Sequence, residues 1–182
     1  MSYLQTSYDS LKRWEGSVPY MYLDSVGLVT VGIGFMLPNV FAASALPFMN
    51  SAGDSSAQIE IATDFARVKD MIPNKLPKFY YHSESPILPQ AEIDRQLAAK
   101  VNAFEVVLRR YFPDYDAYPD SVKLGLIDMT YNLGPARFRA QYPKFYAAIL
   151  AHNWGLAAAQ SHRNGPSEER NEWCKNLFME AV

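Results

Sequence analysis

The chain has 182 residues, of which 49% are apolar and 20% are charged, and its formal net charge is −2. These values are typical of one globular domain and exclude a disordered chain. The near-neutral charge offers no basic tract for nucleic acid. The single cysteine, Cys174, excludes a disulfide framework and a cysteine-rich zinc site.

The first predicted element is a helix over residues 3–15. Leu4, Tyr8, Leu11 and Glu15 recur at helical spacing and share one face, and Gly16 ends the helix. Glu15 therefore closes an apolar stripe. This is unusual, because burying an unpaired carboxylate is costly.

Residues 17–35 are predicted to be extended chain and turns, with Gly27 forming a tight turn after Asp24. The strand expected over 28–34 places Val29, Val31 and Ile33 on one face. The opposite face holds Thr30 and two glycines and has little side-chain bulk. Glycines within a strand often mark the close approach of a ligand or another backbone.

The rest of the chain is predicted to be mainly helical. We expect irregular structure over 36–56, a helix carrying the stripe Ile61, Phe65, Val68 and Ile72, and a proline-rich loop over 73–89. Further helices are expected from Pro89 to about Tyr111, and over 120–133, 142–153, 154–162 and 166–179. The fold class is therefore α+β, with a small β element followed by a helical body.

Two carboxylates and one hydroxyl lie in the first 30 residues with the spacing E-x8-D-x5-T, from Glu15 through Asp24 to Thr30. Glycoside hydrolysis uses two carboxyl groups in different surroundings. Apolar neighbours of Glu15 would raise its pKa, as a general acid needs, whereas a solvated turn would keep Asp24 ionised. Thr30 could hold the attacking water. Alternatively, Glu15 is a solvated helix-end charge and Asp24 only forms a turn.

Four parts of the chain resemble the phage-type lysozymes, the T-even phage lysozyme family (glycoside hydrolase family 24). The most specific is Trp14-Glu15-Gly16, Tyr22-Leu23-Asp24-Ser25 and Thr30-Val31-Gly32-Ile33-Gly34. Residues 125–134 (GLIDMTYNLG) resemble the buried helix of the family's C-terminal lobe, and residues 88–92 (LPQAE) resemble the start of its linking helix. Glu169-Arg170 before Trp173 resembles its last helix. In the family's order, these segments span most of the chain.

The resemblance implies a two-lobed lysozyme-like fold with the active-site cleft between the lobes, in a single domain over 1–182. The small lobe would cover about 16–88, with an insertion at about 37–86, and the helical lobe about 89–182 with helix 1–15. The implied activity is hydrolysis of the β-1,4 bond between N-acetylmuramic acid and N-acetylglucosamine in peptidoglycan, with inversion. Glu15 would be the acid, Asp24 the base or electrostatic partner and Thr30 the water-positioning residue. Inversion requires carboxyl groups about 6.5–9.5 Å apart.

Other residues receive supporting roles. Phe35, Met36, Tyr131 and Asn132 are predicted substrate contacts, although Tyr131 could equally be a core residue. The resemblance implies that Arg170 pairs with Glu15 and orients it. Arg170 also shares a helix face with Trp173, Cys174 and Leu177, and a buried arginine needs a carboxylate. The alternative is a surface pair with Glu169 or Glu172.

The sequence departs from the family at several positions. Phe35 stands where a histidine is common, Asn132 where a glutamine is common, and the stretch between Met36 and Leu88 is longer than in the short phage enzymes. His82, His152 and His162 show no metal-ligand spacing, so we expect no metal and no cofactor. Cys174 is predicted to be a buried structural thiol.

The expected partner is the peptidoglycan glycan strand, bound by a monomer without nucleic acid or membrane insertion. The first residues show no Sec signal, so the protein would be made in the cytoplasm and reach the periplasm or cell wall by another route. It would be a phage endolysin released through a holin, or an antibacterial effector delivered by a secretion machine such as type VI and neutralised by an immunity protein. A lytic transglycosylase and a non-catalytic peptidoglycan-binding module are the alternative functions.

Overall fold

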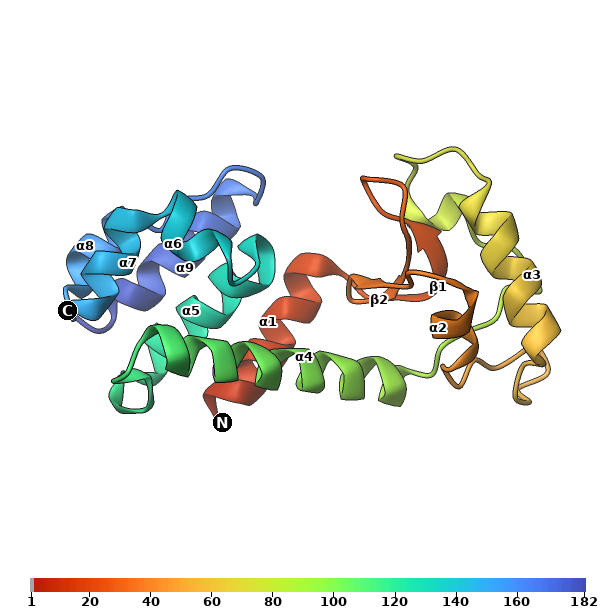
Figure 1. The fold of residues 1–182 in the computed structure, drawn as a ribbon, viewed down its shortest axis with the longest axis horizontal. Helices are drawn as coiled ribbons and strands as arrows, with labels where there is room; N and C mark the ends of the chain where they lie inside the picture. The colour runs from red at the N-terminus through yellow and green to blue at the C-terminus, as the bar shows by residue number, and fades with distance from the viewer. Residues whose placement is uncertain (1) are drawn as a thin grey trace. The chain divides into compact units, whose positions relative to one another are not determined.

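A computed structural model describes residues 2–182 and shows an α+β protein with one small antiparallel sheet (Figure 1). The chain divides into two compact units, each described by itself below. The sheet unit comprises Glu15–Leu97. The helical unit comprises Ala98–Val182 together with the first helix up to Trp14.

The elements of the sheet unit are β1 (Val18–Leu23), β2 (Val29–Gly32), β3 (Phe35–Met36), α2 (Val40–Ser44), α3 (Gln58–Lys69) and the 3-10 turn η1 (Pro77–Phe79). The sheet order is β1-β2-β3, and neighbouring strands are antiparallel. Tyr22 pairs with Thr30, and Thr30 pairs with Met36. Because directly paired residues of an antiparallel sheet point to the same face, these three side chains form one row across the sheet.

Helix α3 covers the sheet and supplies much of this unit's core (Figure 1). Ile61, Phe65 and Val68 of the predicted stripe are buried in it, whereas Ile72 lies beyond the helix and is exposed. The predicted strand 28–34 is shorter than expected, because Ile33 and Gly34 form the turn to β3. The stretch 36–56 is not wholly irregular, since it contains α2, which Asn39 caps through its side chain.

The helical unit contains α1 (Tyr3–Glu15) up to Trp14, most of α4 (Gln90–Tyr111), the turn η2 (Tyr115–Ala117), α5 (Asp120–Leu133), α6 (Arg137–Gln141), α7 (Pro143–Leu150), α8 (Trp154–Ala159) and α9 (Glu168–Met179). Helices α5 and α9 lie against each other. A Cβ atom at Gly125 would lie 2.7 Å from the ring of Phe178, so glycine permits this close approach. Helix α6 is the element of this unit that the sequence analysis missed.

Candidate active site

Glu15 is the last residue of α1, and its side chain is exposed. The expectation that it continues the apolar stripe into the interior is therefore wrong. Leu11 is the buried member of that stripe, and Leu4 and Tyr8 are half-buried. The helix stops directly after Glu15 because Gly16 adopts a positive φ of 74°, so the chain turns away there and leaves Glu15 exposed.

The last turn of α1 is held against α9 within the helical unit. The rings of Trp14 and Trp173 lie 5.9 Å apart, and the Arg13 guanidinium lies 4.5 Å from the Trp14 ring centroid. Arg13 Nη2 also pairs with Glu169 Oε1 at 2.6 Å. These contacts fix the backbone immediately before Glu15, so the carboxyl group projects from a supported helix end.

Asp24 organises the turn between β1 and β2. Its Oδ1 accepts hydrogen bonds from the backbone N–H groups of Val26 and Leu28 at 3.0 and 2.9 Å. Its own backbone N–H donates to Leu28 at 3.0 Å, and its carbonyl accepts from Gly27 at 3.1 Å. Short acidic side chains commonly form such hydrogen bonds in turns. A role of Asp24 in the turn does not conflict with a catalytic role, because the same residue can do both.

Thr30 lies in the middle of β2 and is buried between its two cross-strand partners. Its hydroxyl donates to the carbonyl of Leu28 at 3.0 Å. The prediction of an open face around Thr30 is therefore wrong, because Tyr22 and Met36 flank it on the same side of the sheet. Met36 itself is 54% exposed, so this row of side chains runs from the interior to the surface.

Gly32 leaves room for the protein's own Phe35 rather than for a ligand. A Cβ atom at position 32 would lie 2.9 Å from Cδ2 of Phe35 and 3.4 Å from Cγ2 of Ile93. The backbone of Gly32 also has a positive φ of 65°, which side-chain-bearing residues rarely adopt. The glycine is thus required by the β2–β3 hairpin, and the interpretation of this strand face as cleared for substrate is wrong at position 32.

We expect Gly32→Ala to lower the free energy of unfolding by about 1–3 kcal/mol more than Gly34→Ala does, because overpacking is added to backbone strain. Gly34 is a matched control, since its φ is 68° and a Cβ there would meet nothing within 4 Å. Urea denaturation of the two variants measures the difference. Equal losses would show that the Phe35 ring moves aside freely.

The phenol of Tyr22 is influenced by the charges of both carboxyl groups, Glu15 and Asp24. Burial, followed by the negative charges of Asp24 and Glu15, raises the pKa of its phenol to about 12. Both carboxyl groups therefore lie within electrostatic reach of one hydroxyl, which stays neutral and can donate a hydrogen bond at neutral pH. Tyr22 belongs to the motif that resembles the phage-type lysozymes, but the sequence predicted no role for it. Its cross-strand pairing with Thr30 is the feature that brings it to the candidate site.

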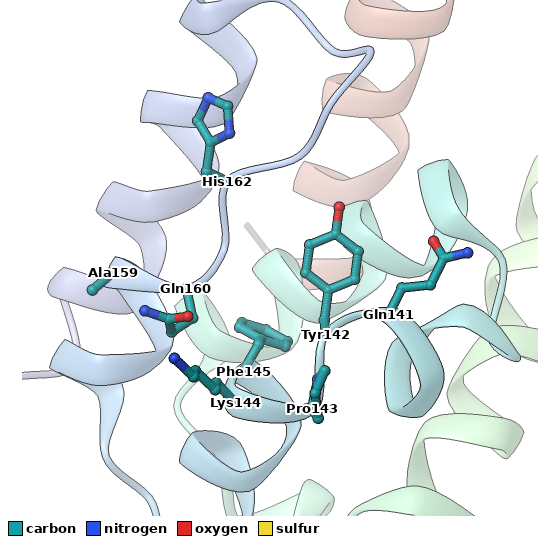
Figure 2. A pocket seen from close by; sticks show the side chains of 8 residues that line it. All are labelled: Gln141, Tyr142, Pro143, Lys144, Phe145, Ala159, Gln160 and His162. Atoms are coloured by element: carbon teal, nitrogen blue, oxygen red, sulfur yellow. The ribbon is translucent and has the colours of Figure 1, made fainter.

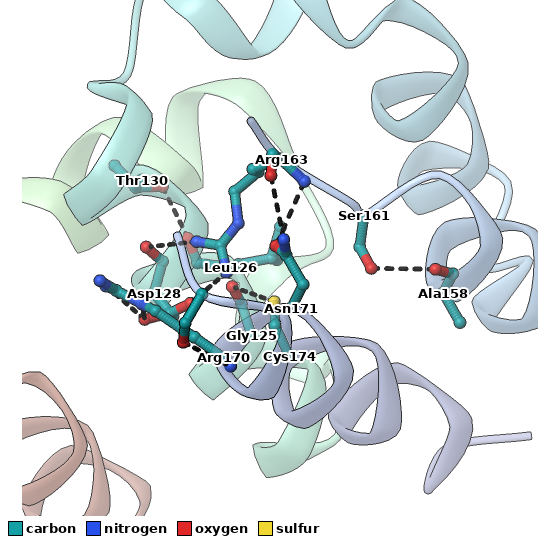
Figure 3. A network of polar contacts seen from close by, with 11 residues as sticks. Gly125, Leu126, Asp128, Thr130, Ala158, Ser161, Arg163, Arg170, Asn171 and Cys174 are labelled. Carbon is teal, nitrogen blue, oxygen red and sulfur yellow. Dashed lines mark hydrogen bonds and ion pairs between the residues drawn. The ribbon is translucent and has the colours of Figure 1, made fainter. Parts of the chain in front are cut away.

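Arg170 is buried, as its helix face predicts, and it pairs with a carboxylate that the sequence analysis did not single out. Its Nε and Nη2 donate to Asp128 Oδ1 of α5 at 3.0 and 2.7 Å (Figure 3). The alternative of a surface pair is wrong, because Glu169 pairs with Arg13 and Glu172 with Lys175. The orienting pair with Glu15 stays a prediction from the sequence.

A second arginine completes this buried network. Arg163 Nη2 lies 2.8 Å from Asp128 Oδ2, and Asn171 donates to the carbonyl of Arg163 at 2.9 Å. Cys174 lies beside this network with its Sγ 3.9 Å from the carbonyl of Gly125 (Figure 3). Burial, followed by the charge of Asp128, raises the pKa of the thiol to about 12. The predicted buried, structural character of Cys174 is confirmed.

The two predicted substrate contacts of α5 lie at its C-terminal end. Tyr131 is half-buried, with its ring edge-on to Phe104 at 5.9 Å and the Lys100 ammonium 4.1 Å from its centroid. Asn132 is exposed. Tyr131 thus has contacts typical of a residue at the core boundary, and both residues keep their substrate roles as predictions.

The helical unit also has a cavity of about 390 Å³ that contains none of the predicted site residues. Figure 2 shows it between Gln141 and Tyr142 on one side and Gln160 and His162 on the other. Within residues 2–182, no helix is both long and apolar enough to cross a bilayer, and no cluster of three or more His, Cys, Asp or Glu side chains is arranged to hold a metal ion. In comparisons with known proteins, no family model and no curated protein matches this chain.

Proposed function

We propose that this protein is a lysozyme-like muramidase, which hydrolyses the β-1,4 bond between N-acetylmuramic acid and N-acetylglucosamine in peptidoglycan. The observation that carries the proposal is the shared electrostatic influence of Glu15 and Asp24 on the hydroxyl of Tyr22, the cross-strand partner of Thr30. This shared influence supports a site in which two carboxyl groups and a hydroxyl, separated along the chain, act on one substrate. The two-lobed lysozyme-like arrangement is part of the proposal.

The local geometry supports a different role for each carboxyl group. Glu15 is the general acid, and a bound glycan strand would exclude water from its exposed side chain and favour the protonated form. Asp24 is the base. Within residues 2–182, its carboxylate accepts two hydrogen bonds from backbone N–H groups, and both end on Oδ1. Oδ2 is therefore the oxygen suited to activate a water.

Thr30 is the water-positioning residue. Because its hydroxyl proton is donated to Leu28, its oxygen can only accept a hydrogen bond from a water. A water that donates one proton to Thr30 and the other to Asp24 turns a lone pair toward the anomeric carbon. Phe35 and Met36 of the sheet unit, and Tyr131 and Asn132 of the helical unit, are the proposed contacts to sugars.

The products of digestion test the reaction class. Purified peptidoglycan incubated with the protein and analysed by mass spectrometry should give fragments with reducing muramic ends. Anhydro-muramic ends would show the alternative function, a lytic transglycosylase that needs no water. An absence of soluble fragments would leave the second alternative, a non-catalytic peptidoglycan-binding module.

Asp24→Asn separates hydrolysis from transglycosylation further. Asparagine keeps a side-chain oxygen for the backbone N–H groups of Val26 and Leu28, so the turn should fold, but it removes the charge. We expect the rate of wall clearing to fall by about 10²–10⁴-fold, the usual contribution of one acid–base group. Asp54→Asn, at an exposed position of the same unit, is the control. Full activity of Asp24→Asn would favour the transglycosylase.

The route to the substrate belongs to the same proposal. Peptidoglycan lies outside the cytoplasmic membrane, so the protein would be released through a holin as a phage endolysin or delivered by a secretion machine as an antibacterial effector. An effector requires an immunity protein in the producing cell. Neighbouring genes distinguish the two, since a holin gene indicates the first and a gene for a small secreted inhibitor the second.

A further inference from the structure

A polar cavity of about 460 Å³ lies in the sheet unit, away from Asp24 and Thr30 along the chain. Its walls come from the loop before α3, from α3 between Ile59 and Arg67, and from the segment after η1. The residues that matter for its chemistry are Ile59, Glu60, Asp64, Arg67, His82 and Glu84. The segment 37–86, which is longer here than in the short phage lysozymes, supplies all of them.

Asp64 is the central group of this cavity, and its hydrogen bonding is one-sided. Its Oδ1 accepts from Arg67 Nε and Nη2 at 2.9 and 2.7 Å, and lies 3.1 Å from His82 Nε2. Its Oδ2 is buried and accepts no hydrogen bond from residues 2–182, although the side chain is only 4% exposed. A buried carboxylate oxygen that accepts no hydrogen bond is unfavourable. A ligand that donates a hydrogen bond to Oδ2 would remove this cost.

Arg67 and His82, the two side chains that contact Asp64, also form contacts with other groups. His82 Nδ1 accepts a hydrogen bond from the backbone N–H of Glu84 at 3.1 Å, which leaves Nε2 as the ring nitrogen that faces Asp64. Arg67 also donates to the carbonyl of Tyr80 at 2.7 Å and contacts the Met71 sulfur. The positive charge of Arg67 is therefore already paired with Asp64.

The negative charges at the rim of the cavity favour a positively charged ligand. Glu60 and Glu84 are exposed and form no salt bridge within residues 2–182, so they add two negative charges beside Asp64. No phenylalanine, tyrosine or tryptophan side chain lines the cavity in the described chain, so a sugar ring would find no large aromatic surface to stack on. The acidic groups and His82 also lack the arrangement of a metal site. An organic ammonium group, which carries a positive charge and N–H donors, fits this lining.

We propose that this cavity binds the ammonium group of a lysine-type side chain in a short peptide. The ammonium supplies three N–H donors, one of which satisfies Asp64. Aspartate carboxyl groups rotate easily about χ2, so Oδ2 can turn toward the cavity while Oδ1 stays near Arg67. Ile59 is 73% exposed at the mouth and provides an apolar contact for the methylene stem.

Titration of the tripeptide Ala-Lys-Ala into the ¹⁵N-labelled full-length protein tests this site. We expect saturable shifts in the NMR amide signals of Thr63 and Glu84, and about tenfold or greater weakening when the lysine is Nε-acetylated, because acetylation removes the charge. Absence of saturable shifts at these amides, or equal affinity for the acetylated peptide, would overturn the proposal.

Variants assign the binding to the named groups. Asp64→Asn should weaken binding about tenfold or more, and Asp70→Asn, exposed at the end of the same helix, should leave it unchanged. If Asp64→Asn fails to fold, the double variant Glu60→Gln, Glu84→Gln tests the rim alone, and equal affinity of this folded variant would contradict the proposal. Glutamine at position 60 keeps an oxygen for the Ala57 N–H that caps α3.

The source of the lysine-type group is resolved by a second peptide. The peptidoglycan stem tripeptide L-Ala-γ-D-Glu-L-Lys binding more tightly than Ala-Lys-Ala identifies the wall as the source, whereas equal binding identifies lysine-bearing peptides in general. Both results support the site. The experiment uses no glycan, so its outcome is independent of whether Glu15 and Asp24 cleave sugars.

Discussion

Glu15→Gln is expected to lower the rate at which the protein clears suspended peptidoglycan by at least about 10²-fold, and by up to about 10⁴-fold. Glutamine has nearly the same shape as glutamate but cannot give a proton to the leaving oxygen. The residue is exposed at the end of α1, and glutamine keeps its size, so the variant should fold. The loss would then be chemical in origin.

Turbidity of purified peptidoglycan is the measurement, with wild type and variant at equal concentration and with thermal unfolding recorded for both. Glu180→Gln, an exposed glutamate just after α9, provides a control that should clear peptidoglycan like wild type. Equal clearing by Glu15→Gln and wild type would end the assignment of Glu15 as the acid and, with it, the proposed mechanism.

Asp128→Asn is expected to lower the free energy of unfolding by about 3–5 kcal/mol, because it removes the charge that two buried arginines share. Asp128 and Arg163 side chains are 2% and 0% exposed, and Arg170 is 6% exposed, so water cannot replace the lost partner. Asparagine would also direct its amide N–H groups toward guanidinium donors. The destabilisation should therefore exceed that of an ordinary surface substitution several-fold.

Asp120→Asn is the matched control for this variant. Asp120 lies on the same helix, but its side chain is 68% exposed and it pairs with Lys123 at 3.6 Å, an arrangement worth less than about 1 kcal/mol. Urea denaturation followed by circular dichroism compares the two. A loss of less than about 1 kcal/mol for Asp128→Asn would show that the buried arginines are stabilised by other groups.

Sequence periodicity was a good guide to the long helices. The apolar stripes of α1, α3 and α4 repeat over several turns, so local chain chemistry largely determines these helices. Helices α2 and α6 have five residues each, too few for a repeat to show. The Asn39 cap was the available signal for α2, whereas α6 has no side-chain cap.

The candidate site was harder to predict than the helices, because its details depend on partners distant in sequence. The exposure of Glu15 follows from the turn at Gly16, and the burial of Thr30 follows from strands on both sides. Asp128 was visible as an acid inside an apolar helix. Its two arginine partners lie more than thirty residues away, which a pattern read locally along the chain does not connect.

The burial of Cys174 determines how its thiol behaves in reducing and oxidising compartments. A thiol that is fully buried and whose pKa is near 12 supplies almost no thiolate, the form that attacks disulfides and peroxides. Since the chain has no other cysteine, two copies have no sulfur with which to crosslink. The thiol of this chain is therefore expected to stay reduced in both reducing and oxidising surroundings.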